Sequence, residues 1–166
     1  MLEFLKICSV YFVLLHCCNL GLTYDIIINM NKNFLNREIV SLKDLNQMNI
    51  LELAFIGDSV FELYVKNELV KKIDKVKNLT IKASSILNAH SQCEAFFRIQ
   101  DKLTDDERNV VMRGRNATIH TKAKNFSIEE YRYATALESL IGYLYLTGRD
   151  DRLEDIFNEM KLFGEE

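Results

Sequence analysis

The sequence predicts an all-α fold, in which the helices of one domain form a bundle. The chain contains no proline, the residue that interrupts helices most strongly. Apolar residues recur at helical spacing in several segments, and no segment shows the two-residue alternation of a strand. With 166 residues and 48% hydrophobic content, the chain can bury a sizeable core but is short for a second full domain.

Two helices are expected at the start of this domain. Ser41 opens a capping-box pattern, so we expect a short helix over residues 41–48. A long helix is expected from about residue 51 to residue 71, with apolar side chains around almost its whole circumference. Such a pattern is typical of a buried central helix.

The middle of the chain predicts two more helices. The third begins at Asn78 or Thr80 and ends near residue 98. The fourth begins after Thr104, which is followed by three acids, and ends near Gly114. The polar stretch over residues 115–126 is expected to be irregular.

Two helices complete the expected bundle. Ser127 and Glu130 form a capping-box pattern before a long, mostly apolar helix that reaches Thr147, with Gly148 as its stop. An amphipathic helix over about residues 150–163 follows.

The charge is divided unevenly along the chain. The formal net charge is −3, and the segment from Asp150 onward, with seven acids and two basic residues, contributes −5 of it. The remaining part therefore carries +2. This distribution argues against indiscriminate binding to polyanions, but it permits a local patch that binds RNA.

The cysteines indicate a reducing compartment. Three of the four lie in the first 20 residues, and Cys93 stands alone in a predicted helix. There is neither a disulfide framework nor a spaced zinc motif, so we expect a cytoplasmic protein.

Residues 7–15 form an apolar run that superficially suggests a secretory signal. The run is too short to span a bilayer, and no small-x-small cleavage site follows it. Three interpretations remain open: a signal peptide, a real N-terminal helix, or an extension before a functional start at Met30. We favour the last, with residues 1–29 as the extension and residues 30–166 as a single domain that does not associate with membranes.

Two carboxylates, Asp58 and Glu138, occur in the most apolar predicted helices. Burying a carboxylate costs several kcal/mol unless it is paired or binds a metal. No Lys or Arg lies one turn from either, and Glu62 adds a negative charge beside Asp58, which favours a divalent cation as partner. Alternatively, both acids point outward, or they pair with Arg113 or Arg132 in the fold.

Three motifs occur in the order found in the ribonuclease III family. The first is AFIGDSVFEL at residues 54–63, the second is RGRNA at residues 113–117 with Lys124-Asn125 after it, and the third is YRYATALESLIGYLYL at residues 131–146. Together they resemble the short branch called mini-ribonuclease III. The resemblance covers about residues 51–163, and the double-stranded-RNA-binding domain of the larger relatives is not expected.

This resemblance implies a Mg²⁺-dependent endoribonuclease that cleaves double-stranded RNA to 5′-phosphate and 3′-hydroxyl ends. Asp58 and Glu138 become its catalytic, metal-binding carboxylates. The implied substrate is a precursor of (23S) ribosomal RNA. The implied assembly is a homodimer, with an accessory ribosomal protein as a further partner. The alternative is a catalytically silent scaffold that binds structured RNA, which the intact pair of acids argues against.

The polar segment after the fourth helix is the candidate RNA-binding element. It contains basic residues and no acid, so it can follow the phosphates across the minor groove of A-form RNA. Its charge alone is equally compatible with an ordinary solvated loop. The candidate RNA-binding residues are Arg113, Arg115, Asn116, Lys122 and Lys124.

Four positions depart from the family pattern. Thr118 and Ala123 stand where Lys and Pro are common in the binding loop. Leu51 and Thr135 stand where the larger ribonucleases III have two further acids. The reduced set of acids fits the short branch and leaves the number of metal ions open.

Overall fold

The computed structural model describes residues 37–73, 75–118 and 125–163, and this described part is helical with no strand. The chain divides into two compact units, Met1–Glu38 and Ile39–Glu166, and every described helix belongs to the second. The all-α prediction is therefore confirmed. The predictions for residues 1–29 and for a start at Met30 lie outside the described residues.

The first two described helices begin at side-chain caps. Helix α3 spans Leu42–Gln47, and the Ser41 hydroxyl accepts a hydrogen bond from the backbone N–H of Asp44. Helix α4 spans Ile50–Lys72 and starts with a capping box formed by Asn49 and Glu52. Both helices were expected, and the box places the start of α4 one residue earlier than predicted.

The single helix expected over residues 78–98 is a wrong prediction, because two helices occupy this region. Helix α5 spans Val76–Ile86 and helix α6 spans Ala89–Ile99. Asn88 separates them: its side-chain amide donates to the carbonyls of Ser84 and Ser85, and its side-chain oxygen accepts from the N–H of Ser91. One asparagine thus closes α5 and caps α6, without a glycine or proline to mark the break.

The remaining helices follow the predicted order. After the 3₁₀ turn η1 (Gln100–Lys102), α7 spans Asp105–Arg115 and α8 spans Ile128–Leu146, and each of these two helices begins with a capping box. Gly148 has a φ of 69°, which ends the α8 segment as expected. Helix α9 spans Asp150–Glu159.

Helix α9 is shorter than predicted. It ends at Glu159 instead of continuing to residue 163. Lys161 has a φ of 48°, and this left-handed backbone conformation is incompatible with a continuing α-helix.

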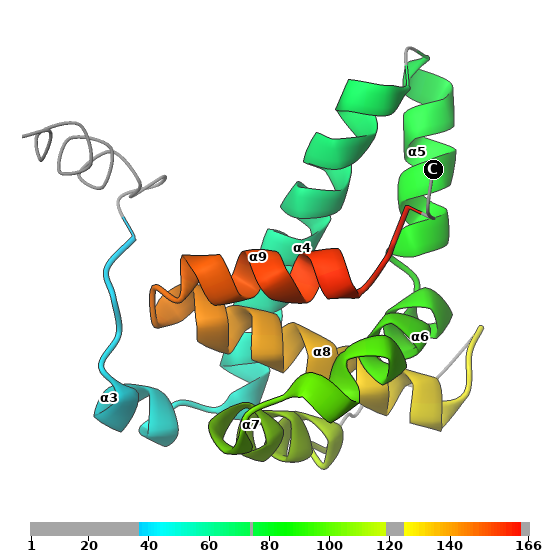
Figure 1. Ribbon diagram of the computed structural model, residues 1–166. Coiled ribbons are helices and arrows are strands. Elements are labelled where there is room, and N and C mark those ends of the chain that lie inside the picture. The colour runs from blue at the N-terminus through cyan, green and yellow to red at the C-terminus, as the bar shows by residue number, and fades with distance from the viewer. Residues whose placement is uncertain (1–36, 74, 119–124, 164–166) are drawn as a thin grey trace, which may run out of the picture. The chain divides into compact units, whose positions relative to one another are not determined.

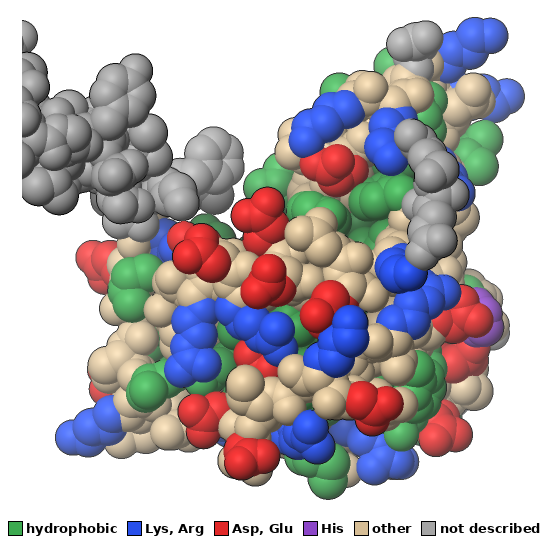
Figure 2. All heavy atoms as spheres, viewed as in Figure 1, with side chains coloured by type: hydrophobic (Ala, Val, Ile, Leu, Met, Phe, Trp, Pro, Cys, Tyr) green, Lys and Arg blue, Asp and Glu red, His purple; other side chains and the backbone are tan. Residues whose placement is uncertain are grey.

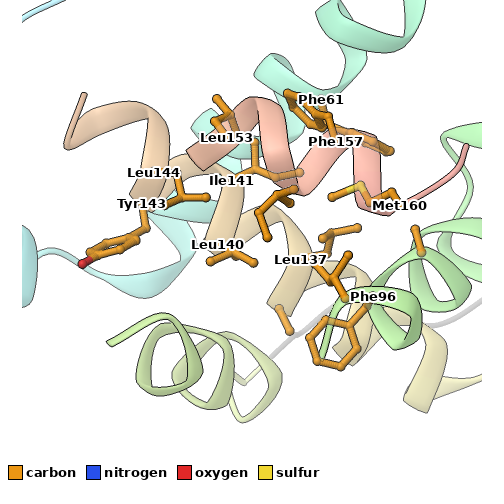
Figure 3. Close-up of a cluster of buried hydrophobic side chains, with 14 of the residues drawn as sticks. Phe61, Phe96, Leu137, Leu140, Ile141, Tyr143, Leu144, Leu153, Phe157 and Met160 are labelled. Atoms are coloured by element: carbon orange, nitrogen blue, oxygen red, sulfur yellow. The ribbon is translucent and has the colours of Figure 1, made fainter. Parts of the chain in front are cut away.

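Helix α8 is the centre of the bundle. It packs against α4, α6, α7 and α9, and α9 crosses it in Figure 1. The core side chains converge on α8 from these helices, as Figure 3 shows. Fully buried members include Phe61, Leu137, Ile141, Ile156 and Met160. Each such side chain contributes about 1.5–3 kcal/mol by leaving water.

Helix α4, expected to be a buried central helix, is covered on one face only. One face of α4 enters the core through Leu53, Phe61 and Val65. The opposite face leaves large apolar side chains in solvent, among them Phe55, which is 74% exposed, and Leu63, which is 51% exposed. Helix α8 takes the central position, so only the face of α4 that meets α8 and its neighbours is covered.

An ion pair between Glu107 and Arg152 ties α9 to α7. The Arg152 side chain donates from Nε to one oxygen of Glu107 at 2.9 Å and from Nη2 to the other at 3.0 Å. The same Nη2 donates to the carbonyl of Lys102 at 3.0 Å. The Glu107 side chain is only 1% exposed, so this pair belongs to the interior of the scaffold.

The surface near α9 carries both signs of charge. Figure 2 shows acidic and basic side chains interspersed on this face, with no single-sign patch across it. Such a mixed face is poorly suited to hold a phosphate backbone. None of the described helices combines the length and apolar composition needed to cross a membrane.

Candidate active site

The two candidate carboxylates meet where α4 and α8 cross. At this crossing the two backbones approach so closely that only glycine fits: a Cβ atom on Gly57 would lie 1.8 Å from the carbonyl oxygen of Glu138. A Cβ atom on Gly142 would lie 2.0 Å from the carbonyl oxygen of Leu53. Because Asp58 follows Gly57 directly, this close packing brings the acid of α4 beside the acid of α8.

Asp58 and Glu138 line the same open pocket, which has a volume of about 470 Å³. Helix α4 contributes Asp58 and Phe55 to its wall, α8 contributes Glu138, and the start of α6 contributes Gln92. The prediction that the two acids come together is therefore in agreement with the geometry. Their catalytic and metal-binding roles stay predictions.

The electrostatics of the pocket disfavour two negative charges. Burial raises the pKa of Glu138 to about 8, the neighbouring Asp58 charge adds to this rise, and a hydrogen bond from the Gln92 side chain opposes it. Burial, followed by the charge of Glu62, raises the pKa of Asp58. Neither acid forms an ion pair with a basic side chain in the described part of the chain. The pocket therefore disfavours the ionisation of both acids unless it binds a cation that the described residues do not supply.

These two carboxylates fit a hard divalent cation. Residues 37–73, 75–118 and 125–163 contain no cluster of three or more acidic, histidine or cysteine side chains able to hold a metal. A cation held here by Asp58 and Glu138 would therefore have few protein ligands. Mg²⁺ suits such a donor set, because it prefers oxygen ligands and keeps several of its waters.

The departures from the larger ribonucleases III also lie at this pocket. Leu51 and Thr135, which stand where those relatives have further acids, are both part of the pocket wall. The Thr135 hydroxyl donates to the carbonyl of Tyr131 at 3.0 Å, one helical turn earlier. The pocket thus has room near Glu138 for ligands that this sequence does not supply.

The candidate RNA-binding residues are partly described. Arg113 donates to the carbonyl of Met48 at 3.1 Å, and the Arg115 guanidinium lies 5.0 Å from the ring centre of Tyr133. Asn116 is the exposed C-cap of α7. The chain then reaches the active-site pocket, because Thr118 is part of its wall.

Lys122 and Lys124, the other two candidates, lie outside the described residues. Contact between RNA and the five candidate RNA-binding residues stays a prediction. The alternative pairing of the active-site acids with Arg113 is not observed, because the Arg113 side chain donates to Met48 instead.

Gln92, which sequence reasoning overlooked, and Tyr131, the first residue of the third motif, also line the pocket. Gln92 is 3% exposed and lies on the buried face of α6, between Ala89 and Phe96. A polar side chain on an otherwise apolar helix face was a signal that could have found it. Tyr131 gives no such signal, because tyrosine is common on both buried and exposed surfaces.

Comparison with known proteins identifies similar sequences and similar solved structures. The ribonuclease III domain matches residues 51–149, a range that includes both pocket acids. Mini-ribonuclease 3 of Clostridium tetani is 43% identical over 129 residues, which cover 76% of this chain and 85% of that relative.

Two further proteins extend this comparison. Mini-ribonuclease 3 of Staphylococcus aureus is 39% identical over 116 residues, covering 68% of this chain and 87% of the relative. The crystal structure of a Fusobacterium nucleatum protein, 29% identical, superimposes with a TM-score of 0.65 and covers 69% of this chain and 93% of its own.

Proposed function

The chain belongs to the mini-ribonuclease 3 branch of the ribonuclease III family, and we propose that it cleaves double-stranded regions of a ribosomal RNA precursor with the help of Mg²⁺. It is an endoribonuclease, as the sequence motifs predicted. The observation that carries the proposal is a pair of acids, Asp58 and Glu138, that share one open pocket and form no ion pair with a described basic residue.

The chain's own residues prepare this pocket for phosphate chemistry. Gly57 and Gly142 fix the helix crossing, so Asp58 and Glu138 are presented from two rigid helices. These acids would hold Mg²⁺, which when bound polarises the scissile phosphate and makes water a better nucleophile near neutral pH. Hydrolysis in this way leaves 5′-phosphate and 3′-hydroxyl ends.

The segment that follows α7 is proposed to hold the RNA. Thr118 in the pocket wall places the start of this segment beside the two acids. Arg115, Asn116, Lys122 and Lys124 would contact phosphates and 2′-hydroxyls. Arg113 uses only part of its five N–H donors on Met48, so its guanidinium can still contribute charge to a nearby phosphate.

A homodimer is proposed as the working unit. The outer face of α4 exposes Leu51, Phe55 and Leu63, and the first two also line the active-site pocket. Covering this face with the same face of a second copy would remove apolar surface from water and bring two pockets together, one for each RNA strand. The cytoplasm as compartment and an accessory ribosomal protein as partner rest on the family resemblance alone.

The test is cleavage of a duplex-containing ribosomal RNA precursor by the purified chain, with Mg²⁺ and with EDTA. Asp58→Asn and Glu138→Gln are compared with the wild-type chain, and Glu154→Gln, which changes an exposed acid of α9 outside the pocket, serves as the control. We expect Mg²⁺-dependent cuts with 5′-phosphate ends, at least a 100-fold loss in the first two variants, and near wild-type cleavage by the control.

Binding measurements separate this proposal from the scaffold alternative. Asp58→Asn should still bind the precursor in a gel-shift assay, because it removes a cation ligand and leaves the basic segment unchanged. If the wild-type chain binds duplex RNA but leaves it intact at every Mg²⁺ concentration, the catalytically silent scaffold is the better interpretation.

A further inference from the structure

Gln92 stands out as a buried polar side chain that the proposed mechanism does not use. It is 3% exposed and lies in the pocket that contains Asp58 and Glu138. Two of its neighbours are hydrogen-bond acceptors: the carbonyl of Leu87, 3.3 Å from its Nε2, and the Glu138 carboxylate, to which it also donates. Since only the amide nitrogen can donate, these neighbours fix which way the amide faces.

The other end of the same amide is unusual. The Oε1 atom of Gln92 is buried and has no hydrogen-bond partner among the described residues. Leaving a buried acceptor without a partner costs about 1–3 kcal/mol. An apolar side chain would avoid this cost, so the amide at this position is better explained by what it does for the pocket than by the stability of α6.

We propose that Gln92 is a positioning residue of the active site, whose N–H group holds the Glu138 carboxylate in the orientation that faces Asp58. The proposal rests on the proposed metal-dependent function and deepens it. The amide of Gln92 also donates to the carbonyl of Leu87, and Gln92 belongs to α6. Glu138 is therefore held by an element other than its own helix. Such outer hydrogen bonds orient metal ligands, and their loss typically weakens metal affinity or activity by about 10–100-fold.

The experiment compares Gln92→Met and Gln92→Leu with the wild-type chain. Both replacements are apolar and of similar volume, and neither can donate to Glu138. Two independent arms are measured: steady-state cleavage of the duplex precursor, and the Mg²⁺ concentration that gives half of the maximal rise in melting temperature without RNA. Cys93→Ala is the matched control, because it truncates a buried neighbour on α6 that does not line the pocket.

We expect kcat to fall at least ten-fold in both variants, KM for RNA to change less than three-fold, and the Mg²⁺ midpoint to rise about ten-fold. The control should keep its midpoint even if its melting temperature falls. Wild-type kcat and midpoint in either well-folded Gln92 variant, or an equal shift of the midpoint in Cys93→Ala, would overturn the proposal. If the wild-type chain itself does not cleave, the proposed function fails, while the Mg²⁺ midpoints still decide the role of Gln92.

Discussion

Two glutamates in this protein lie on helices that pack in the core, Glu107 at the start of α7 and Glu138 in the middle of α8, and they have opposite surroundings. Burial by itself raises the pKa of Glu107, but hydrogen bonds and charge from Arg152, together with hydrogen bonds from Thr104, outweigh it and hold this pKa below its ordinary value. Burial and the charge of Asp58 both disfavour the ionised form of Glu138, and only a hydrogen bond from Gln92 favours it, so the pKa of Glu138 rises to about 8.

The difference teaches how to distinguish a structural acid from a functional one. The sequence distinguishes the two only partly: Glu107 is the third acid after the cap Thr104, whereas Glu138 stands in a mostly apolar helix, and neither pattern shows which cation lies nearby. A buried acid matched by an arginine connects two parts of the scaffold. A buried acid without a matching cation is energetically costly to ionise, and such acids are found often at functional sites.

The strongest test of this contrast is removal of the arginine from the structural pair. Arg152→Met should lower the free energy of unfolding by about 3 kcal/mol, because it leaves the Glu107 carboxylate buried without its partner. Urea denaturation followed by circular dichroism measures this change. Arg132→Met, which removes an exposed arginine of α8, is the control and should change stability by less than about 0.5 kcal/mol. Equal effects of the two variants would contradict the structural role of the pair.

Neutralising Glu138 should change the free energy of unfolding in the opposite direction. Without divalent cations at pH 7, Glu138→Gln should raise the free energy of unfolding by about 1 kcal/mol, because Glu138, with its raised pKa, must take up a proton on folding and glutamine need not. Glu107→Gln should lower it, because Arg152 then loses its ionic partner. Both are measured in EDTA by urea denaturation. A destabilised Glu138→Gln variant would mean that this carboxylate supports the scaffold after all.

A third acid in the pocket should increase the affinity of the pocket for a cation. Thr135→Asp places a carboxylate one helical turn before Glu138, in the pocket wall. We expect the Mg²⁺ concentration for half-maximal thermal stabilisation to fall about three- to ten-fold, because the cation gains a protein oxygen ligand. Thr135→Asn adds similar bulk without charge, and an equal response in that variant would exclude the added ligand as the cause.

The smallest expected effect is on stability in acid. Because the pKa of folded Glu107 lies below the ordinary value of 4.5, its contribution is fully present above pH 4.5 and is lost as the pH falls through the lowered value. The wild-type chain should therefore lose more stability below pH 4.5 than Arg152→Met does. Denaturation curves at several pH values measure this difference. If the two proteins lose stability equally as the pH falls, the ion pair with Arg152 is not the cause of the lowered pKa of Glu107.

Most of the fold could be predicted from local signals. The capping patterns at Ser41, Thr104 and Ser127 marked three helix starts correctly, and Gly148 marked a stop. These signals work because a cap satisfies backbone groups within a few residues of itself. The break at Asn88 escaped prediction because the same residue type that caps a helix is also tolerated within one.

The candidate site was predictable only as far as its motifs extended. Asp58 and Glu138 could be singled out because an ionised acid in an apolar helix is unfavourable without a cation as its partner. Gln92 and the bond from Arg113 to Met48 were missed, since each depends on which helix lies opposite. The spacing of residues along one helix carries no information about the acceptor that another helix presents.

The glycine contact between α4 and α8 has a consequence for the synthesis of the protein. Gly57 and Gly142 are 85 positions apart, and Asp58 and Glu138 come together only when this contact forms. A nascent chain that has emerged from the ribosome only as far as Arg115 already contains Asp58 but lacks α8 entirely. The pocket that holds both acids therefore forms only after α8 has been synthesised and has packed against α4.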